Sequence, residues 1–337
     1  MKEYMLAWGA RLKAQGKKNW SFNPVPCAMC LLAHMMNFIT NVIWNNISKS
    51  DRTTMEIIDK AAAMQKRCEE IRQSGKTIAL VPTMGFLHDG HLELMREGNW
   101  LADILVLSIF VNPTQFGPAE DYQTYPRDMK GDLQKAEEVG VDIVYAPPVD
   151  EMYPEGFQTK VIVEGITKQL CGLSRPGHFD GVATVVTKLF NIVKPNIAIF
   201  GKKDFQQLTV IRRMARDLNM DIEIIGVPTV REPDGLAMSS RNKYLNAEER
   251  ESALCLKKSI DMALGLINEG ERDVERLKAS IREFILKYPF TNIEYVSICD
   301  HLSLEEIGTL KEKALLAISV KVGKTRLIDN WEIDVTT

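Results

Sequence analysis

Short apolar runs alternate along the middle of the chain with longer stretches in which apolar residues recur at helical spacing. The runs have the length and composition of buried strands and lie at residues 78–81, 104–111, 141–146, 197–200 and 222–227. The helical stretches lie at about residues 90–102, 129–139, 183–193 and 205–218. Alternating strands and helices are typical of a parallel sheet with right-handed crossover connections. We therefore predict an α/β fold built on a doubly wound, Rossmann-like parallel sheet.

The segments that flank this alternation predict further elements. Residues 53–56 have the spacing of a helix capping box, and a helical apolar face follows to about Gly75: Ile57, Ile58, Ala61, Met64, Cys68 and Ile71. Beyond Asn246, two amphipathic helices precede half-exposed strands, and these elements lie at about 247–268, 271–287, 293–298, 317–322 and 325–328. We predict a Rossmann-like domain over residues 55–230 and a smaller C-terminal α+β lid domain over residues 231–337.

Residues 1–54 differ from the rest of the chain. The stretch 27–47 lacks formal charge and follows several basic residues, which raises the question of an export signal or membrane anchor. However, a polar stripe runs through it at helical spacing, formed by His34, Asn37, Asn41 and Asn45. We favour an amphipathic or poorly ordered extension without assigned function. An over-long start is the other reading, since Met55 would open a self-sufficient domain.

Composition narrows the classes of partner. The chain has 337 residues and a net charge of −3, so it lacks the broad basic footprint of a protein that binds nucleic acid or an anionic membrane. Its six cysteines are scattered, which favours free thiols in a reducing cytoplasm: Cys27, Cys30, Cys68, Cys171, Cys255 and Cys299. Cys27 and Cys30 form a C-x-x-C near His34, but no second ligand pair accompanies them, so we predict no metal site.

The residues after the first apolar run carry the strongest chemical signal. Gly85 allows a tight turn, and His88 and His91 then lie at the predicted start of a helix. Free N–H groups and the helix dipole favour anions there, and imidazoles stabilise developing charge on phosphate. Two ordinary loop histidines are the alternative. Because the chain has only five histidines and two of them flank one glycine turn, we favour the functional interpretation.

Polar and basic residues also follow the other predicted strands. Amides lie in 112–117, Lys203 and Asp204 follow the fourth strand, and Ser239, Ser240 and Arg241 follow the fifth. Each could be ordinary surface, but the carboxyl ends of parallel strands share one edge of a sheet. Lysine and arginine bind phosphate oxygens, and Asp204 suits ribose hydroxyls. Since no G-x-x-x-x-G-K-[ST] loop is present, attack at an α-phosphate with loss of pyrophosphate fits better than γ-phosphoryl transfer.

At these positions the sequence resembles the pantothenate synthetase family. The likeness is collinear from about Met55 to the C-terminus and rests on long motifs: Pro82-Thr-Met-Gly-Phe-Leu-His-Asp-Gly-His91, Phe110-Val-Asn-Pro-Thr-Gln-Phe-Gly117, Ser174-Arg-Pro-Gly-His-Phe-Asp-Gly181, Gly201-Lys-Lys-Asp-Phe-Gln-Gln207 and Asp234-Gly-Leu-Ala-Met-Ser-Ser-Arg-Asn242. It implies a two-step ligase. ATP and (R)-pantoate form pantoyl adenylate and pyrophosphate, and β-alanine then attacks the acyl carbon to give pantothenate and AMP.

The resemblance also implies roles for individual residues. His88, His91, Lys203 and Arg241 would be catalytic; we expect the histidines to stabilise the pentacoordinate phosphate, because a carboxylate nucleophile has no proton to lose. Gln115 and Gln207 would bind pantoate, with Gln115 also near β-alanine. ATP, accompanied by Mg²⁺, would contact Met84, Gly85, Phe86, Leu87, His88, Asp89, Gly90, His91, Gly201, Lys202, Lys203, Asp204, Val230, Met238, Ser239, Ser240 and Arg241. The resemblance further suggests a homodimer.

Two positions depart from the family pattern, and other readings stay open. Lys202 replaces a Glu or Gln, and Cys171 replaces a frequent Glu, which puts any metal role there in doubt. No carboxylate cluster identifies a protein ligand for Mg²⁺. The nearest alternatives are another nucleotidyltransferase with an H-x-G-H motif, a truncated aminoacyl-tRNA synthetase, or a catalytically silent nucleotide sensor. Low positive charge argues against the synthetase, and the presence of transition-state groups argues against the sensor.

Overall fold

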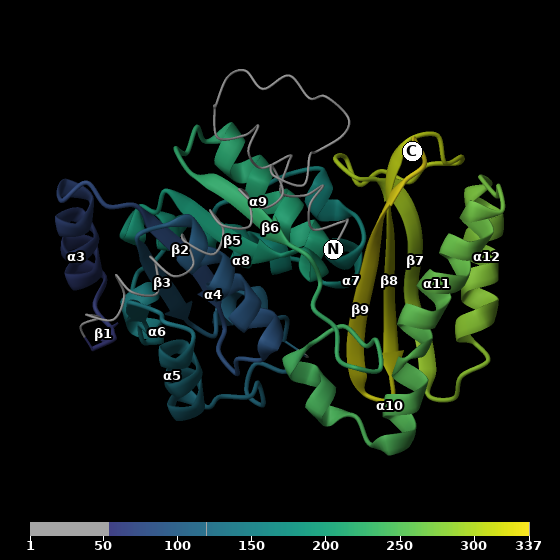
Figure 1. Cartoon of the computed structure of the whole chain (residues 1–337), viewed down its shortest axis with the longest axis horizontal. Coiled ribbons are helices and arrows are strands. Elements are labelled where there is room, and N and C mark those ends of the chain that lie inside the picture. Colours follow the sequence, from purple (N-terminus) through teal and green to yellow (C-terminus); the bar gives the residue numbers. More distant parts are fainter. Residues whose placement is uncertain (1–53, 119, 337) are drawn as a thin grey trace, which may run out of the picture. The chain divides into compact units, whose positions relative to one another are not determined.

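A six-stranded parallel sheet forms the centre of the protein. The structure is a computed structural model that describes residues 54–118 and 120–336. The sheet contains β1 (Glu56–Ile58), β2 (Ile78–Thr83), β3 (Ile104–Ile109), β4 (Ile143–Tyr145), β5 (Ile197–Gly201) and β6 (Glu223–Val227), in the order β1-β4-β3-β2-β5-β6. The chain therefore builds outward from β2 to one side and then crosses to β5 on the other side. The predicted doubly wound α/β fold is confirmed (Figure 1).

Helices cover both faces of this sheet. On one face lie α3 (Ala61–Gln73), α8 (His178–Val193) and α9 (Phe205–Asp217); on the other lie α4 (Asp89–Leu101) and α5 (Met129–Glu138). Alternate residues of β2 show the two layers, because Ile78 and Leu80 pack into the core of α3 and α8 whereas Ala79 and Val81 pack into the core of α4. Burial on both faces explains why the strands appear in the sequence as continuous apolar runs.

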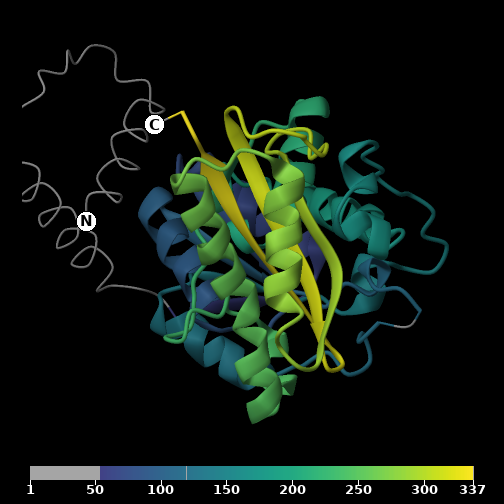
Figure 2. The ribbon, with the colours of Figure 1, turned by 90° about the vertical axis from the view of Figure 1, so that its right-hand side faces the viewer.

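The C-terminal part forms a second, smaller layer structure. Its antiparallel sheet has the order β7-β8-β9 and consists of β7 (Thr291–Asp300), β8 (Lys313–Val322) and β9 (Thr325–Asp334). One face packs on α11 (Cys255–Asn268) and α12 (Val274–Ile285), which Figure 2 shows in front of the strands. The other face contributes Cys299, Leu315 and Ala317 to the core that contains α8. The two sheets thus share one continuous apolar core.

The predicted helix beginning near residue 53 is wrong at its start. Ile57 and Ile58 belong to β1, which pairs with β4 at the edge of the sheet, and α3 begins only at Ala61. Its first N–H group, on Ala61, donates to the Glu151 carboxylate at 2.9 Å. The cap is thus supplied by a distant residue and not by the local box. The buried residues Met64, Cys68 and Ile71 lie on the predicted face.

Other predicted boundaries shift modestly. The helix predicted over 247–268 is divided at Leu254 into α10 (Ala247–Ala253) and α11. The prediction for residues 1–54, including Cys27, Cys30 and His34, lies outside the described residues apart from Thr54. Across the described part of the chain, no helix combines the length and apolar character needed to cross a membrane.

Candidate active site

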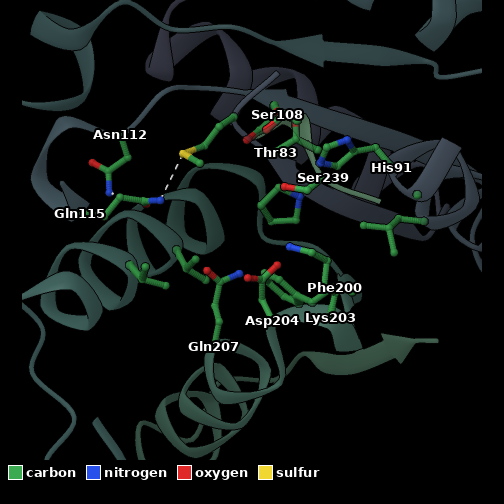
Figure 3. A pocket seen from close by; sticks show the side chains of 18 of the residues that line it. Thr83, His91, Ser108, Asn112, Gln115, Phe200, Lys203, Asp204, Gln207 and Ser239 are labelled. Atoms are coloured by element: carbon green, nitrogen blue, oxygen red, sulfur yellow. Dashed lines mark hydrogen bonds between the residues drawn. The ribbon is translucent and has the colours of Figure 1, made fainter. Parts of the chain in front are cut away.

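A cleft opens where the strand order reverses, between the carboxyl ends of β2 and β5. It measures about 230 Å³ and is lined by residues that follow β2, β3, β5 and β6 (Figure 3). In a doubly wound sheet the loops after the two central strands diverge to opposite faces, which leaves a crevice between them. The turn that leads to His88 and His91 (the histidine turn) follows β2, and the turn that carries Lys203 (the Lys203 turn) follows β5. The topology therefore brings these two predicted groups together.

The two histidines form one unit at the start of α4. His88 is the residue before the helix, and its backbone N–H donates to Nδ1 of His91 at 3.3 Å. The ring centroids are 4.0 Å apart. Because Nδ1 of His91 accepts this hydrogen bond, its proton resides on Nε2. His91 is thereby defined as a donor toward the cleft.

Burial keeps both imidazoles neutral. It lowers the pKa of His88 to about 4, with a smaller contribution from the positive charge of Lys203. The pKa of His91 also lies well below its ordinary value, first because of burial and then because of His88 and Lys203. The pair therefore offers N–H dipoles and no positive charge near neutral pH. The positive charge that faces these imidazoles comes from Lys203, which lines the same cleft.

The Lys203 turn is the opposite wall. β5 ends at Gly201, and the 3-10 turn η3 (Lys202–Asp204) directs Lys203 and Asp204 into the cleft, whose lining also includes Gln207 from the first turn of α9. Lys202 does not line the cleft; its ammonium group pairs with Glu332 on β9. The predicted contact of Lys202 with the nucleotide therefore has no support from its position.

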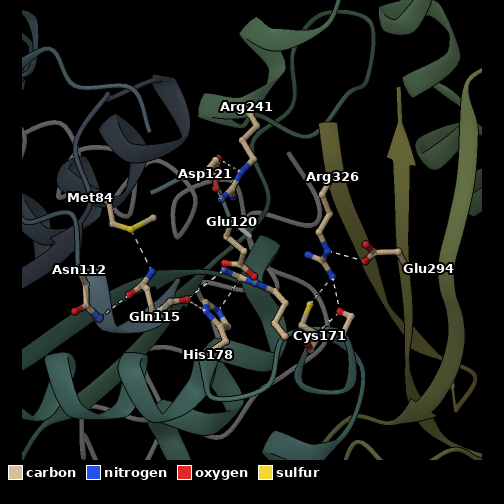
Figure 4. Close-up of polar contacts among 12 residues, drawn as sticks. Met84, Asn112, Gln115, Glu120, Asp121, Cys171, His178, Arg241, Glu294 and Arg326 are labelled. Carbon is tan, nitrogen blue, oxygen red and sulfur yellow. Dashed lines mark hydrogen bonds and ion pairs between the residues drawn. The ribbon is translucent and has the colours of Figure 1, made fainter. Parts of the chain in front are cut away.

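Arg241 also lines the cleft, but its guanidinium group already binds a carboxylate of the protein. Its guanidinium group donates to both carboxylate oxygens of Asp121, at 2.9 and 2.8 Å. A parallel pair joins Arg175 to Glu120 at 2.7 and 2.6 Å (Figure 4). Two adjacent acids thus neutralise two arginines that line the cleft. A phosphate group that binds Arg241 has to compete with Asp121.

Part of the cleft is lined by amide and apolar side chains. The side-chain oxygen of Gln115 accepts from Asn112 at 3.0 Å, and its NH2 group faces the sulfur of Met84 at 3.1 Å. Apolar side chains of the sheet and of α8 complete the lining: Pro82, Phe110, Val182, Val185, Val186, Leu189 and Phe200. The pocket therefore combines amide groups with apolar walls.

His178 supports the backbone of this pocket. Its Nδ1–H donates to the carbonyl of Gln115 at 2.8 Å, and its Nε2 accepts from Arg175 at 2.9 Å. Burial, followed by the charge of Arg175, lowers the pKa of His178 to about 4. Arg175 and His178 line the cleft but carried no assigned role from the sequence, although both belong to the motif 174–181. Membership in that motif was the one signal that could have found them.

Asp132 is a buried residue that no motif or spacing in the sequence singles out. Its two carboxylate oxygens accept the N–H groups of Phe86 and Leu87, each at 2.7 Å, and Lys135 donates to the Leu87 carbonyl at 2.7 Å. Gly85 and Phe86 both have positive φ, of 80° and 51°. This conformation is costly for phenylalanine, so the carboxylate stabilises a strained turn that leads directly to His88.

The structure separates the predicted residues into two groups. One group lines the cleft: Met84, His88, Gly90, His91, Gln115, Gly201, Lys203, Asp204, Gln207, Val230, Met238, Ser239, Ser240 and Arg241. The other does not: Gly85, Phe86, Leu87, Asp89 and Lys202. Gly85, Phe86 and Leu87 form the strained turn, and Asp89 begins α4. Their positions indicate a structural contribution to the site.

Comparisons with known proteins decide the family. The family model described as pantoate-beta-alanine ligase matches residues 56–332. Curated pantothenate synthetases from Geobacter sulfurreducens and Syntrophus aciditrophicus are 60% and 58% identical over 276 residues, which is 82% of this chain and 98% and 96% of the relatives. The chain belongs to the pantoate–β-alanine ligase family. The predicted family, fold class and ligase activity are confirmed.

Solved structures of this ligase family agree. The pantothenate synthetase from Thermus thermophilus superposes with a TM-score of 0.78 at 42% identity, covering 82% of this chain and 99% of that one. The ligase from Francisella tularensis, described as a complex with β-γ ATP and β-alanine, gives 0.67 at 34% identity, covering 82% and 97%. Because each match covers nearly the whole length of the relative and 82% of this chain, the similarity includes the C-terminal sheet as well as the parallel sheet.

Cys171 contacts a tyrosine and an arginine. Its sulfur contacts the Tyr295 hydroxyl at 3.1 Å. Arg326 donates to the same sulfur at 3.5 Å (Figure 4). Within residues 54–118 and 120–336, no group of three or more histidine, cysteine or acidic residues could hold a metal ion. Asp204 is the one carboxylate among the described residues that line the cleft.

We predict that Asp132→Asn lowers kcat about 10-fold to 100-fold, since an amide accepts from only one of the two N–H groups and misplaces the histidine turn. The matched control is Asp128→Asn at the start of the same helix, where the side chain caps Gly131. It should cost at most about 1 kcal/mol of stability and leave kcat unchanged. Steady-state kinetics and thermal unfolding of both variants measure the difference; equal kcat values would contradict the role of Asp132.

We also predict a pH dependence of stability from His178. The unfolded chain protonates this residue near its ordinary pKa of 6.5, whereas the folded protein resists protonation down to about 4. The stability contribution is therefore complete above 6.5 and falls by about 3 kcal/mol as pH decreases through that window. Denaturant unfolding between pH 7 and pH 4 should show a shallower decline for His178→Asn than for the native protein. Identical slopes would contradict the neutral, buried state of His178.

Proposed function

We propose that the protein joins (R)-pantoate to β-alanine with ATP, through pantoyl adenylate, and releases AMP and pyrophosphate. The observation that carries the proposal is the convergence of His88, His91 and Lys203 on one cleft whose floor is the Gln115 pocket. A site for α-phosphate activation needs anion-stabilising groups on one side and an acid-binding pocket beside them. The cleft contains both.

The nucleotide is assigned to the side lined by the loops after β5 and β6. Asp204 accepts from ribose hydroxyls, and Val230 and Met238 contact the base. Ser239 and Ser240 add hydroxyl donors for the phosphates. Mg²⁺ would accompany ATP and offset its phosphate charge; Asp204, the one carboxylate among the described residues that line the cleft, is assigned to the ribose. This arrangement suits a metal that is held mainly by phosphate oxygens and water.

Pantoate is assigned to the pocket beneath. Gln115 and Gln207 present amide groups for its hydroxyl and carboxylate oxygens, and the apolar residues of α8 accommodate its dimethyl carbon. β-Alanine later enters near Gln115. Holding the carboxylate beside the α-phosphate supplies the proximity on which an intermolecular displacement depends.

The first step is displacement at phosphorus. A pantoate carboxylate oxygen forms a bond to the α-phosphorus, and the bond to the bridging oxygen of pyrophosphate breaks. Negative charge grows on the oxygens around phosphorus, where the Nε2–H of His91 and the ammonium group of Lys203 stabilise it. The nucleophile carries no proton, so neutral histidines suffice and a general base is not needed.

The second step transfers the acyl group. The neutral amine of β-alanine attacks the acyl carbon, AMP leaves with the bonding electron pair, and the nitrogen loses its proton to water or to the released phosphate group. Exclusion of bulk water by the C-terminal α+β layer protects the adenylate from hydrolysis. We further propose that the protein acts as a homodimer in the cytoplasm, binding neither nucleic acid nor membrane.

Isotope exchange tests the adenylate directly. We expect labelled pyrophosphate to enter ATP only when pantoate is present. β-Alanine should not be required, because the first step is reversible and uses only ATP and pantoate. Exchange is measured with each substrate omitted in turn. Exchange in the absence of pantoate, or exchange supported only by a different acid, would contradict the proposed substrate.

Variants of His91 test the donor role of Nε2. His91→Ala should lower kcat about 10²-fold to 10³-fold with little change in ATP affinity, because a donor used mainly in the transition state is lost. His91→Gln places an N–H group near the position of Nε2 and should retain more activity than His91→Asn, which reaches only the position of Nδ1. His301→Ala, outside the cleft, serves as the control. Equal activity of the Gln and Asn variants would contradict the assigned tautomer.

A further inference from the structure

Asn330 on β9 connects the C-terminal sheet to the turn that carries Lys203. Its side-chain nitrogen donates to the carbonyl of Lys202 at 3.0 Å and to the carbonyl of Lys203 at 2.7 Å. The residue is 8% exposed. Both hydrogens of one amide group therefore bind two successive carbonyls of η3, in an environment largely shielded from water.

Asn330 is itself held firmly in place. The preceding residue, Asp329, is 2% exposed and accepts the Asn330 backbone N–H at 2.8 Å. Its carboxylate also receives two hydrogen bonds from Arg231, at 2.6 and 2.9 Å. Arg231 belongs to the segment between β6 and η4 (Ser240–Tyr244), which contributes Val230 and Met238 to the cleft. Strand β9 thus contacts two segments that line the cleft, η3 and the segment that contains Arg231.

The chemistry of the contact requires a primary amide. Two N–H groups on one nitrogen can satisfy two carbonyls at once, whereas aspartate would present oxygen to oxygen and an aliphatic side chain would leave both carbonyls without donors. Buried carbonyls without donors are costly, so the turn would move to find other partners. Such a movement would displace the Lys203 side chain, which begins at the bonded residue.

We propose that Asn330 is a positioning residue for Lys203: its amide group fixes the η3 backbone so that the lysine ammonium meets the α-phosphate during adenylate formation. This inference rests on the proposed function, in which Lys203 stabilises the transition state. It assigns the C-terminal sheet a direct part in the first chemical step, in addition to covering the cleft.

A second contact from the same strand provides a matched control. Glu332 on β9 pairs with the side chain of Lys202; both groups are partly exposed, and this contact joins side chains and not the η3 carbonyls. Exposed ion pairs contribute little to structure. Glu332→Gln should therefore change the rate of adenylate formation less than about twofold. This control shows whether any contact between β9 and η3 is sufficient or whether the Asn330 amide is needed.

The test is a double-mutant cycle on the full chain, read out by pantoate-dependent exchange of pyrophosphate into ATP. Asn330→Ala should lower the exchange rate about 10-fold to 100-fold, the scale expected for misplacing a catalytic group by about 1 Å, with little change in the KM for ATP. Lys203→Met should lower it at least as much. In the Lys203→Met background, adding Asn330→Ala should change the rate less than about threefold, because Asn330 acts through that lysine.

Three outcomes would overturn the inference. The first is an equal loss from Asn330→Ala in both backgrounds, which would show an independent, structural effect. The second is a loss no larger than that of Glu332→Gln. The third is a Lys203→Met variant with full exchange activity, which would refute the proposed role of Lys203 as well. Thermal unfolding of every variant confirms that rates are compared between folded proteins, and Asn330→Ser, which keeps one donor, replaces the alanine variant in the cycle if that variant does not fold.

Discussion

The reversal of strand order between β2 and β5 is the constraint on which the site depends. The two strands are hydrogen-bonded neighbours, yet the chain leaves them toward opposite faces of the sheet. One departure leads into the histidine turn and α4, and the other leads into η3 and α9. A phosphate group placed between them meets the start of a helix on one side and an ammonium group on the other. Few other points of a parallel sheet bring such groups together without a long loop.

Desolvation then determines how the site uses its polar groups. Buried imidazoles that remain neutral give up charge but keep strong, fixed dipoles, and the backbone N–H of His88 sets the direction of the dipole on His91. Positive charge is confined to the lysine and arginine side chains that line the cleft. A site organised in this way needs little rearrangement when charge develops on phosphorus, because its donors are already oriented.

Sequence patterns predicted the parts of this protein that depend on local rules. Apolar runs identified five strands of the parallel sheet, and glycine and histidine spacing identified the turn after β2. The patterns failed where a residue distant in sequence determines the local structure or contact. Ile57 and Ile58 fit a helix as well as a strand, and only the partner β4 makes them a strand. Asp132 and Asn330 act through side-chain contacts with backbone groups 45 or more positions away, and their own neighbours in sequence carry no sign of it. The pairing of Arg241 with Asp121 was equally invisible, because it spans 120 positions.

The ion pair between Arg241 and Asp121 has a consequence for how anions reach this arginine. With its guanidinium group bound in a fork to a carboxylate, Arg241 exposes little unbalanced charge to the cleft. Free sulfate or orthophosphate would have to separate the pair with only a single small anion to offer in exchange. A nucleotide brings ribose, base and three phosphates at once, and its combined binding free energy can offset that cost. Asp121 therefore sets a cost that any ligand has to offset before it binds Arg241.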